Sequence, residues 1–155
     1  MRVMLDTNIL ISSFIFKSSK INELINELSK NHQIVICSYT IEELKELINS
    51  KFNVSEQCLD EFLKNFPYDL VYSPTYVENK IFEIRDDDDY IILHTAIIEN
   101  VDVFITGDKD FKDVKIDRPE IMSVSEFLNK YKKWGLSPKS KTLHIKECPF
   151  CARST

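Results

Sequence analysis

The feature that most constrains the fold is an alternation between two kinds of apolar pattern. Short runs rich in valine and isoleucine predict strands, and they occupy residues 3–5, 33–37, 70–72, 101–105 and 120–122. Longer segments between these runs repeat their apolar residues every three or four positions and predict helices. Strands that alternate with helices in this way are typical of an α/β domain with a mostly parallel sheet.

Two of the predicted helices begin with the spacing of a capping box, in which a hydroxyl side chain and a carboxylate three residues later satisfy free backbone amides. Thr40 with Glu43 has this spacing after the second strand, where Ser38 is an alternative cap. Ser123 with Glu126 has the same spacing ahead of the last helix.

Length and composition exclude several classes of protein. At 155 residues, the chain can bury the core of one domain without a disulfide. Only two glycines occur, which excludes a glycine-rich dinucleotide turn and a P-loop.

No apolar run approaches the ~20 residues that span a bilayer, and no signal peptide is recognisable, so a cytoplasmic protein without a membrane partner is expected. In that reducing compartment, Cys37 and Cys58 are expected to be core residues.

The net charge of -5 is the average of two unlike parts. The first 129 residues carry -11, and the rest, from Lys130 onward, carries +6. The overall sign argues against a nucleic-acid partner held by bulk charge alone. The basic part has Tyr131, Trp134 and Phe150 interleaved, which suits contact with RNA phosphates and stacking on bases. A solvated helix end followed by a flexible terminus is the alternative.

A change in composition after residue 134 divides the chain into a domain at residues 1–134 and a short basic C-terminal tail at residues 135–155. Cys148 and Cys151 form a C-x-x-C pair, and His144 lies four residues earlier. These three side chains could bind Zn²⁺, but a fourth ligand is missing unless a symmetric dimer completes the site. Zinc binding is therefore not the expected outcome.

Acidic residues follow the predicted strands at the end where open parallel sheets bind ligands. Asp6 ends the first strand, Glu43 lies early in the helix after the second strand, and Asp108 follows the fourth strand. Asp89 is the last of four consecutive aspartates ahead of another helix. Carboxylates crowded together repel one another unless a cation lies between them, and oxygen ligands alone suit Mg²⁺ or Mn²⁺. Such an ion retains water that can attack a phosphodiester, which is nuclease chemistry.

Each acid also has a purely structural interpretation. Asp6 could be only a helix N-cap, and Glu43 only the partner of Thr40. Residues 86–89 could be a solvated segment that favours a helix N-terminus, and Asp108 could serve only the T-G-D-x-D turn. The functional interpretation depends on the joint placement of the acids at strand ends.

Several short motifs resemble the PIN-domain family in their order and spacing. They are L-D-T-N at 5–8, S-Y-T-I-E-E-L at 38–44, the aspartate run with its apolar helix at 86–96, and V-F-I-T-G-D-K-D-F at 103–111. The stretch at 121–128, with its S-E-F-L, resembles the VapC-like toxins of toxin-antitoxin systems. The resemblance covers about residues 1–130.

The resemblance implies a PIN-like α/β/α fold, with a parallel sheet between helices, and a Mg²⁺- or Mn²⁺-dependent endoribonuclease. It implies that the metal-binding, catalytic acids are Asp6, Glu43, Asp89 and Asp108. It also implies supporting roles for Thr7, Asn8 and Thr106. Three rivals stay open, because Asp88 could replace Asp89, Asp110 could share the role of Asp108, and Glu42 could replace Glu43.

Toxin members of the family usually dimerise and are neutralised by a partner protein, so the resemblance implies a homodimer and an antitoxin besides the RNA substrate. A housekeeping RNA-processing nuclease is an alternative. Less favoured are a PIN-like domain that binds RNA without cutting it and a receiver-type phosphoacceptor module. The receiver needs an aspartate at the end of the third strand, and this sequence has Ser73 and Pro74 there.

Overall fold

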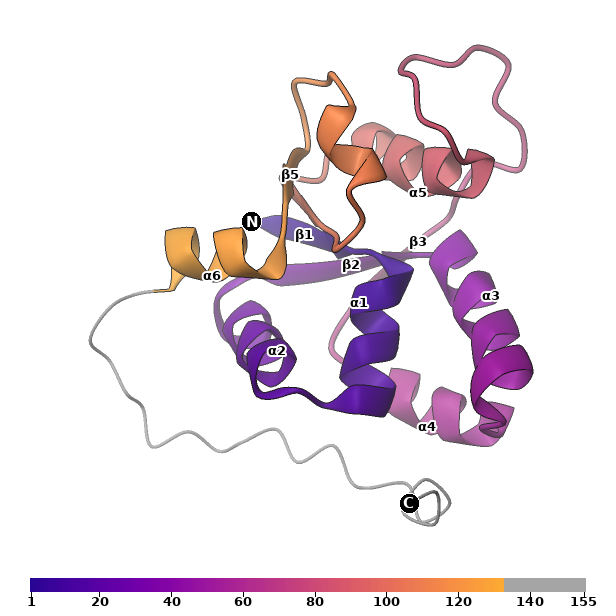
Figure 1. Ribbon diagram of the computed structural model, residues 1–155, viewed down its shortest axis with the longest axis vertical. Helices are drawn as coiled ribbons and strands as arrows, with labels where there is room; N and C mark the ends of the chain where they lie inside the picture. Colours follow the sequence, from indigo (N-terminus) through magenta and orange to yellow (C-terminus); the bar gives the residue numbers. More distant parts are fainter. Residues whose placement is uncertain (133–155) are drawn as a thin grey trace.

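The structure is a computed structural model that describes residues 1–132 (Figure 1). Five strands form one sheet in the order β3-β2-β1-β4-β5, and every neighbouring pair is parallel. Their bounds are β1 (Arg2–Leu5), β2 (Gln33–Cys37), β3 (Asp69–Val71), β4 (Val103–Ile105) and β5 (Glu120–Met122). The predicted strands lie within two residues of these positions, and the predicted parallel sheet is confirmed.

The described residues also form six α-helices and three helical turns, of which all but the last helix lie between strands. The helices are α1 (Thr7–Ile11), α2 (Ser19–Asn31), α3 (Ser38–Leu47), α4 (Glu56–Asn65), α5 (Asp87–Ile98) and α6 (Val124–Tyr131). The π-helical turns η1 (Ser12–Phe16) and η2 (Ile48–Phe52) extend α1 and α3, and η3 (Asp110–Asp113) is a 3₁₀ turn after β4. Figure 1 shows α5 on one side of the sheet and α1, α2 and α6 on the other, so the predicted α/β/α sandwich is confirmed.

The core has two halves because successive strand side chains point to opposite faces of the sheet. Val3 and Leu5 of β1 pack with α1, α2, α3, α4 and α6 on one face. Met4 of the same strand packs with α5, Phe104 and Phe111 on the other. Since both faces are covered, the strands are nearly continuous apolar runs rather than alternating ones.

The register brings the carboxyl ends of the central strands to one edge. Leu5 of β1 pairs with Ile105 of β4, and Ile105 pairs in turn with Met122 of β5. The ladder continues one residue further, because the Asp6 amide donates to the Ile105 carbonyl at 3.1 Å. The chain leaves β1 for β2 on one side and later returns to β4 on the other, so the strand order reverses beside β1. Ligands bind in the crevice at such a reversal point.

The predicted capping box of Thr40 and Glu43 is wrong. β2 runs directly into α3, so Cys37 occupies the N-cap position and no side chain caps the helix. Thr40 is buried in the first turn with its hydroxyl 3.1 Å from the Cys37 sulfur. Ser38, the alternative cap, instead accepts a hydrogen bond from the Ser73 amide at 3.0 Å.

The predicted capping box of the last helix is confirmed. The Ser123 hydroxyl accepts from the Glu126 amide at 3.3 Å, and the Glu126 carboxylate accepts from the Ser123 amide at 2.7 Å. The prediction that Cys37 and Cys58 are core residues is also confirmed, because both are buried. Within residues 1–132, no helix is both long and apolar enough to cross a membrane.

The start of the predicted basic RNA-binding segment contacts the domain. Tyr131 is half-buried against the rings of His32 and Phe127 and is not an exposed stacking platform. Lys130 pairs with Glu120 at 2.7 Å, and Lys132 pairs with Glu23 at 2.5 Å. Trp134 and Phe150, the other aromatic residues of this prediction, lie outside the described part of the chain. The zinc candidates also lie outside it: His144, Cys148 and Cys151.

Candidate functional site

Asp6 is a buried carboxylate with both oxygens fixed, only 3% exposed where β1 ends and α1 begins. One oxygen accepts from the Thr7 amide at 2.8 Å, which is the predicted N-cap bond. The other accepts from the Thr106 hydroxyl of the β4 end, also at 2.8 Å. Burial raises the pKa of Asp6 to about 6 despite both hydrogen bonds, and the charges of Glu43 and Asp108 add to the rise. Asp6 is therefore both a cap and a site residue.

Glu43 lies on α3 and is connected to Asp6 through Thr7. The buried Thr7 hydroxyl donates to the Glu43 carboxylate, while the Thr7 amide donates to Asp6. The rival Glu42 is exposed and has no such bond to Thr7. The geometry therefore favours Glu43 over Glu42.

Asp108 is held beside Asp6 by the second buried threonine. The Thr106 hydroxyl, which donates to Asp6, also accepts from the Asp108 amide at 3.0 Å. The Asp108 carboxylate accepts from the Asp110 amide at 2.9 Å, so the predicted T-G-D-x-D turn forms. Asp110 contributes its backbone to this turn, and its exposed side chain makes no described bond to the other acids.

Asp89 completes the group from the first turn of α5. It is half-buried, whereas the three aspartates before it are exposed. Its pKa is raised to about 7, first by burial and then by the charges of Asp6, Asp86, Asp108 and Glu43. The structure thus brings together the four predicted acids, which we call the carboxylate cluster: Asp6, Glu43, Asp89 and Asp108.

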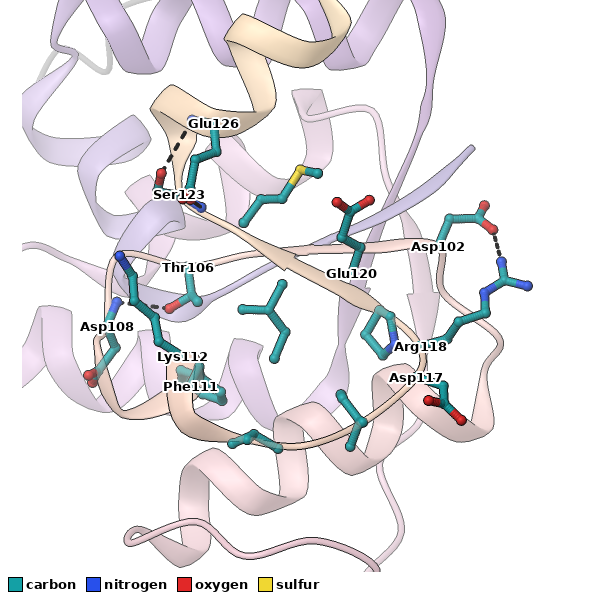
Figure 2. Close-up of a pocket in the computed structure, with 15 residues that line it drawn as sticks. Asp102, Thr106, Asp108, Phe111, Lys112, Asp117, Arg118, Glu120, Ser123 and Glu126 are labelled. Carbon is teal, nitrogen blue, oxygen red and sulfur yellow. Dashed lines mark hydrogen bonds and ion pairs between the residues drawn. The ribbon is translucent and has the colours of Figure 1, made fainter.

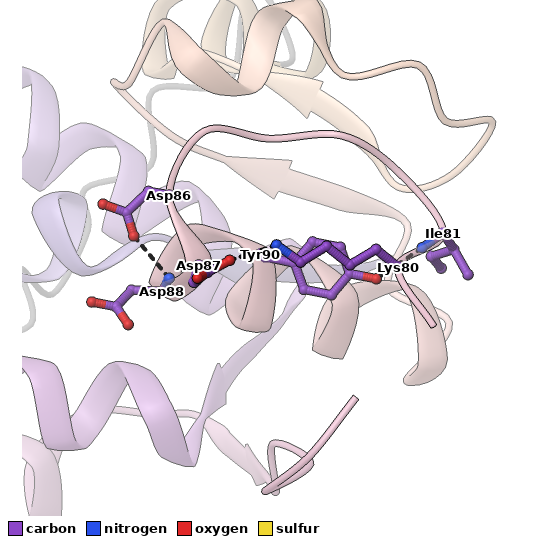
Figure 3. Close-up of polar contacts among 6 residues, drawn as sticks. All are labelled: Lys80, Ile81, Asp86, Asp87, Asp88 and Tyr90. Atoms are coloured by element: carbon purple, nitrogen blue, oxygen red, sulfur yellow. Dashed lines mark hydrogen bonds and ion pairs between the residues drawn. The ribbon is translucent and has the colours of Figure 1, made fainter. Parts of the chain in front are cut away.

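The other three aspartates of the run have structural partners. Asp86 caps α5 by accepting from the Asp88 amide at 2.8 Å, and Asp87 pairs with Lys80 at 2.5 Å (Figure 3). Asp88 accepts a hydrogen bond from the hydroxyl of Tyr39 on α3. The geometry therefore favours Asp89 over Asp88, and the favourable placement of acids at a helix N-terminus accounts for the rest of the run.

Tyr39 is the residue at this edge that the sequence did not reveal. Its bond to Asp88 connects the first turns of α3 and α5, and burial together with Asp88 raises the pKa of the phenol. The two partners are 49 positions apart, so no local pattern could have indicated the pair. Asn8, predicted as a support, is exposed and contributes its carbonyl to the Ser12 hydroxyl at 2.8 Å.

Within residues 1–132, no three acidic, histidine or cysteine side chains are grouped closely enough to hold a metal ion directly. The donors of the carboxylate cluster are nonetheless oxygen only, as hard divalent cations require, and Mg²⁺ retains several waters instead of demanding a full set of protein ligands. The raised pKa values of Asp6 and Asp89 show that negative charge is unfavourable there. A cation would relieve that repulsion, so the residues fit such an ion.

Comparison with known proteins agrees with this architecture. A family model of the PIN domain matches residues 2–110, which include the whole carboxylate cluster. The fold is similar to a chain of the "Crystal structure of VapBC2 from Rickettsia felis bound to a DNA fragment from their promoter", with a TM-score of 0.63 and 24% identity over 79% of this chain and 98% of that chain. A comparison with curated proteins gave no match. Because the family match spans more than half of its length, the chain belongs to the PIN-domain family, whose members are generally nucleases that use divalent metal ions.

Proposed function

We propose that this chain is a Mg²⁺- or Mn²⁺-dependent endoribonuclease that hydrolyses RNA phosphodiester bonds. The observation that carries the proposal is the carboxylate cluster beside the strand reversal, with Asp6 and Asp89 both raised in pKa by burial and mutual repulsion. A divalent ion bound by Asp6, Glu43, Asp89 and Asp108 would offset their charge and polarise a phosphodiester for attack by water.

The two buried threonines hold the acids in place before any ligand arrives. Thr7 fixes one oxygen of Asp6 with its amide and orients Glu43 with its hydroxyl. Thr106 fixes the other oxygen of Asp6 and anchors the Asp108 amide. Thr7 and Thr106 lie just after β1 and β4, so the sheet holds the threonines that contact Asp6, Glu43 and the Asp108 backbone. This arrangement lowers the cost of placing ligands around a cation and substrate.

Thr106→Val is expected to lower kcat/KM for RNA cleavage by about 10- to 100-fold, because it removes the hydroxyl that positions Asp6 and the Asp108 amide. Thr95→Val is the matched control, since Thr95 is equally buried but bonds only to the Ile91 carbonyl of its own helix. Steady-state cleavage of a labelled RNA measures both. Equal losses in the two variants would contradict the positioning role of Thr106.

The proposed activity is tested by incubating the purified chain with a 5′-labelled single-stranded RNA and with DNA of the same sequence. We expect discrete RNA products with Mg²⁺ or Mn²⁺, no products with EDTA, and recovery when Mn²⁺ is restored. Cleavage that persists unchanged in EDTA would refute the metal dependence. Equal cleavage of DNA would refute the preference for RNA.

We further propose that the chain is the toxin of a toxin-antitoxin pair, acting as a cytoplasmic homodimer that an antitoxin protein neutralises. The family match and the fold shared with a VapBC2 chain support this role. Induced expression is expected to arrest growth, and Asp6→Asn is expected to relieve the arrest. Harmless expression of an actively cleaving protein would favour a housekeeping RNA-processing nuclease instead.

The receiver-type alternative does not fit the topology. Receiver modules have the strand order 2-1-3-4-5, whereas this sheet has β1 between β2 and β4 and β3 at an edge. The third strand also ends in Val71, so no aspartate stands at the position that would accept a phosphoryl group.

An RNA-binding domain without activity would bind the labelled RNA in the test above and release no products.

A further inference from the structure

A cavity of about 660 Å³ lies beside the carboxylate cluster, between β5 and the loop that joins β4 to it (Figure 2). Thr106 and Asp108 belong to its lining, so the cavity is continuous with the proposed reaction site. Its volume falls within the roughly 300–1,000 Å³ of typical small-molecule sites. A group bound in this cavity would therefore be close to a phosphodiester bound at the cluster.

One part of the cavity wall is apolar and is formed by Phe111, Val114 and Ile116 of the connecting loop and Ile121 of β5. Polar side chains line the rest, including the carboxylates of Asp102, Asp117, Glu120 and Glu126. Phe111 is fully buried and fixes the loop against Phe104 of β4, with ring centroids 5.0 Å apart. Val114 and Ile116 are only half-buried, so each keeps some surface uncovered. An apolar wall of this kind suits the face of a flat aromatic group.

One backbone donor and one backbone acceptor of β5 also have no strand partner within residues 1–132. The Glu120 amide donates to Asp102, and the Met122 carbonyl accepts from Thr106, so these residues turn their backbone groups toward β4. Because backbone direction alternates along a strand, the amide and carbonyl of Ile121 point away from β4. β5 is an edge strand in the described sheet, and Ile121 lines the cavity. The wall thus offers one donor and one acceptor close together.

Lys112 supplies positive charge at the rim. It is exposed, and its ammonium makes no ion pair within the described part of the chain. Figure 2 draws it at the same end of the cavity as Thr106 and Asp108, while Arg118 lies at the opposite end, paired with Asp102. Lys112 therefore places an exposed positive charge at the end of the cavity where Thr106 and Asp108 lie.

We propose that this cavity binds the base of a nucleotide adjacent to the cleaved bond, with Lys112 contacting a neighbouring phosphate. The inference rests on the proposed function and adds a subsite for unpaired RNA to it. The base stacks on the apolar wall, and its edge meets the amide and carbonyl of Ile121. A protein segment added as a strand fits less well, because three-residue β5 offers one free donor and acceptor instead of a row of them.

Equilibrium binding tests the subsite without relying on cleavage. Fluorescence anisotropy is measured with labelled single-stranded RNAs of about 12 nucleotides, as oligo(A), oligo(C) and oligo(U), in the Asp89→Asn background with Mg²⁺. Ile116→Trp fills the cavity and is expected to weaken binding about 10-fold, and Lys112→Gln about 3-fold. Lys115→Gln, an exposed lysine of the same loop that does not line the cavity, is the control and should bind within about 2-fold of the background protein.

A second set of binding measurements identifies which nucleotide's base occupies the cavity. After wild-type cleavage maps the cut bond in a defined RNA, single abasic positions are introduced on either side of it. One abasic position is expected to weaken binding about 10-fold in the background protein and less than about 2-fold when Ile116→Trp is also present. Unchanged affinity in both cavity variants would overturn the subsite and leave the cavity to a protein segment. Since Lys112 is exposed, Lys112→Gln still tests the subsite if Ile116→Trp fails to fold. Absence of cleavage by the wild type would refute only the proposed function.

Discussion

Asp89→Asn is expected to lower kcat/KM for RNA cleavage by about 100-fold or more while preserving the fold. Asparagine has the shape of aspartate but lacks its charge, so it is a weaker ligand for a hard cation. The side chain is half-buried among the other acids, and its pKa of about 7 reflects burial and their repulsion. The removal of this charge therefore does not cost stability. Steady-state kinetics with a labelled RNA and saturating Mg²⁺ measure the loss.

Asp87→Asn is the matched control for this experiment. Asp87 lies in the same aspartate run and the same first turn of α5, but it is exposed and pairs with Lys80. Its replacement should change kcat/KM by no more than about 2-fold. Equal losses for both variants would mean that the acidic helix start as a whole matters. Full activity of Asp89→Asn would exclude Asp89 from the site.

Asp6→Asn is expected to abolish cleavage and at the same time stabilise the metal-free protein. The pKa of Asp6 rises from 3.8 to about 6 on folding, because burial disfavours its charged form. The unfolded chain therefore loses this proton first, and the free energy of unfolding falls as the pH rises from about 4 to about 6. Above that window the charged carboxylate costs about 3 kcal/mol, of which the neutral amide should recover about 2.

Urea unfolding in EDTA measures this effect at about pH 4 and about pH 8. The variant and the wild type should have similar stability at the lower pH, and the variant should be more stable at the higher pH. Asp60→Asn is the control, since Asp60 is an exposed residue of α4 far along the chain from the site acids. A variant that is less stable than the wild type at the higher pH would contradict the crowding of charge around Asp6.

The strands and the four acids could be predicted from the sequence for one physical reason. Runs of β-branched residues predict buried strands, and parallel strands end at one edge, so acids placed after them converge there. Asp6 and Asp108 follow this rule directly. The capping box at Thr40 failed because β2 continues into α3 without a loop, and no local pattern shows how many residues separate a strand from the next helix.

The choice between Asp88 and Asp89 depends on the rotation of α5 about its axis. Leu93 and Ala96 lie four and seven positions after Asp89 and are fully buried, but Ile92 and Thr95 lie at the same spacing after Asp88 and are buried too. The periodicity of the sequence therefore does not choose between the two aspartates. Likewise, the Tyr39–Asp88 bond and the cavity beside β5 depend on contacts between distant segments, and no local periodicity encodes them.

Calorimetric titration of Mn²⁺ into the purified protein most directly tests whether the carboxylate cluster holds the divalent ion used for hydrolysis. At about pH 8, the wild type and Asp87→Asn should bind Mn²⁺ alike, and Asp89→Asn should bind it at least about 10-fold more weakly. Equal affinity in all three proteins, or no binding by the wild type, would contradict a metal site at Asp6, Glu43, Asp89 and Asp108.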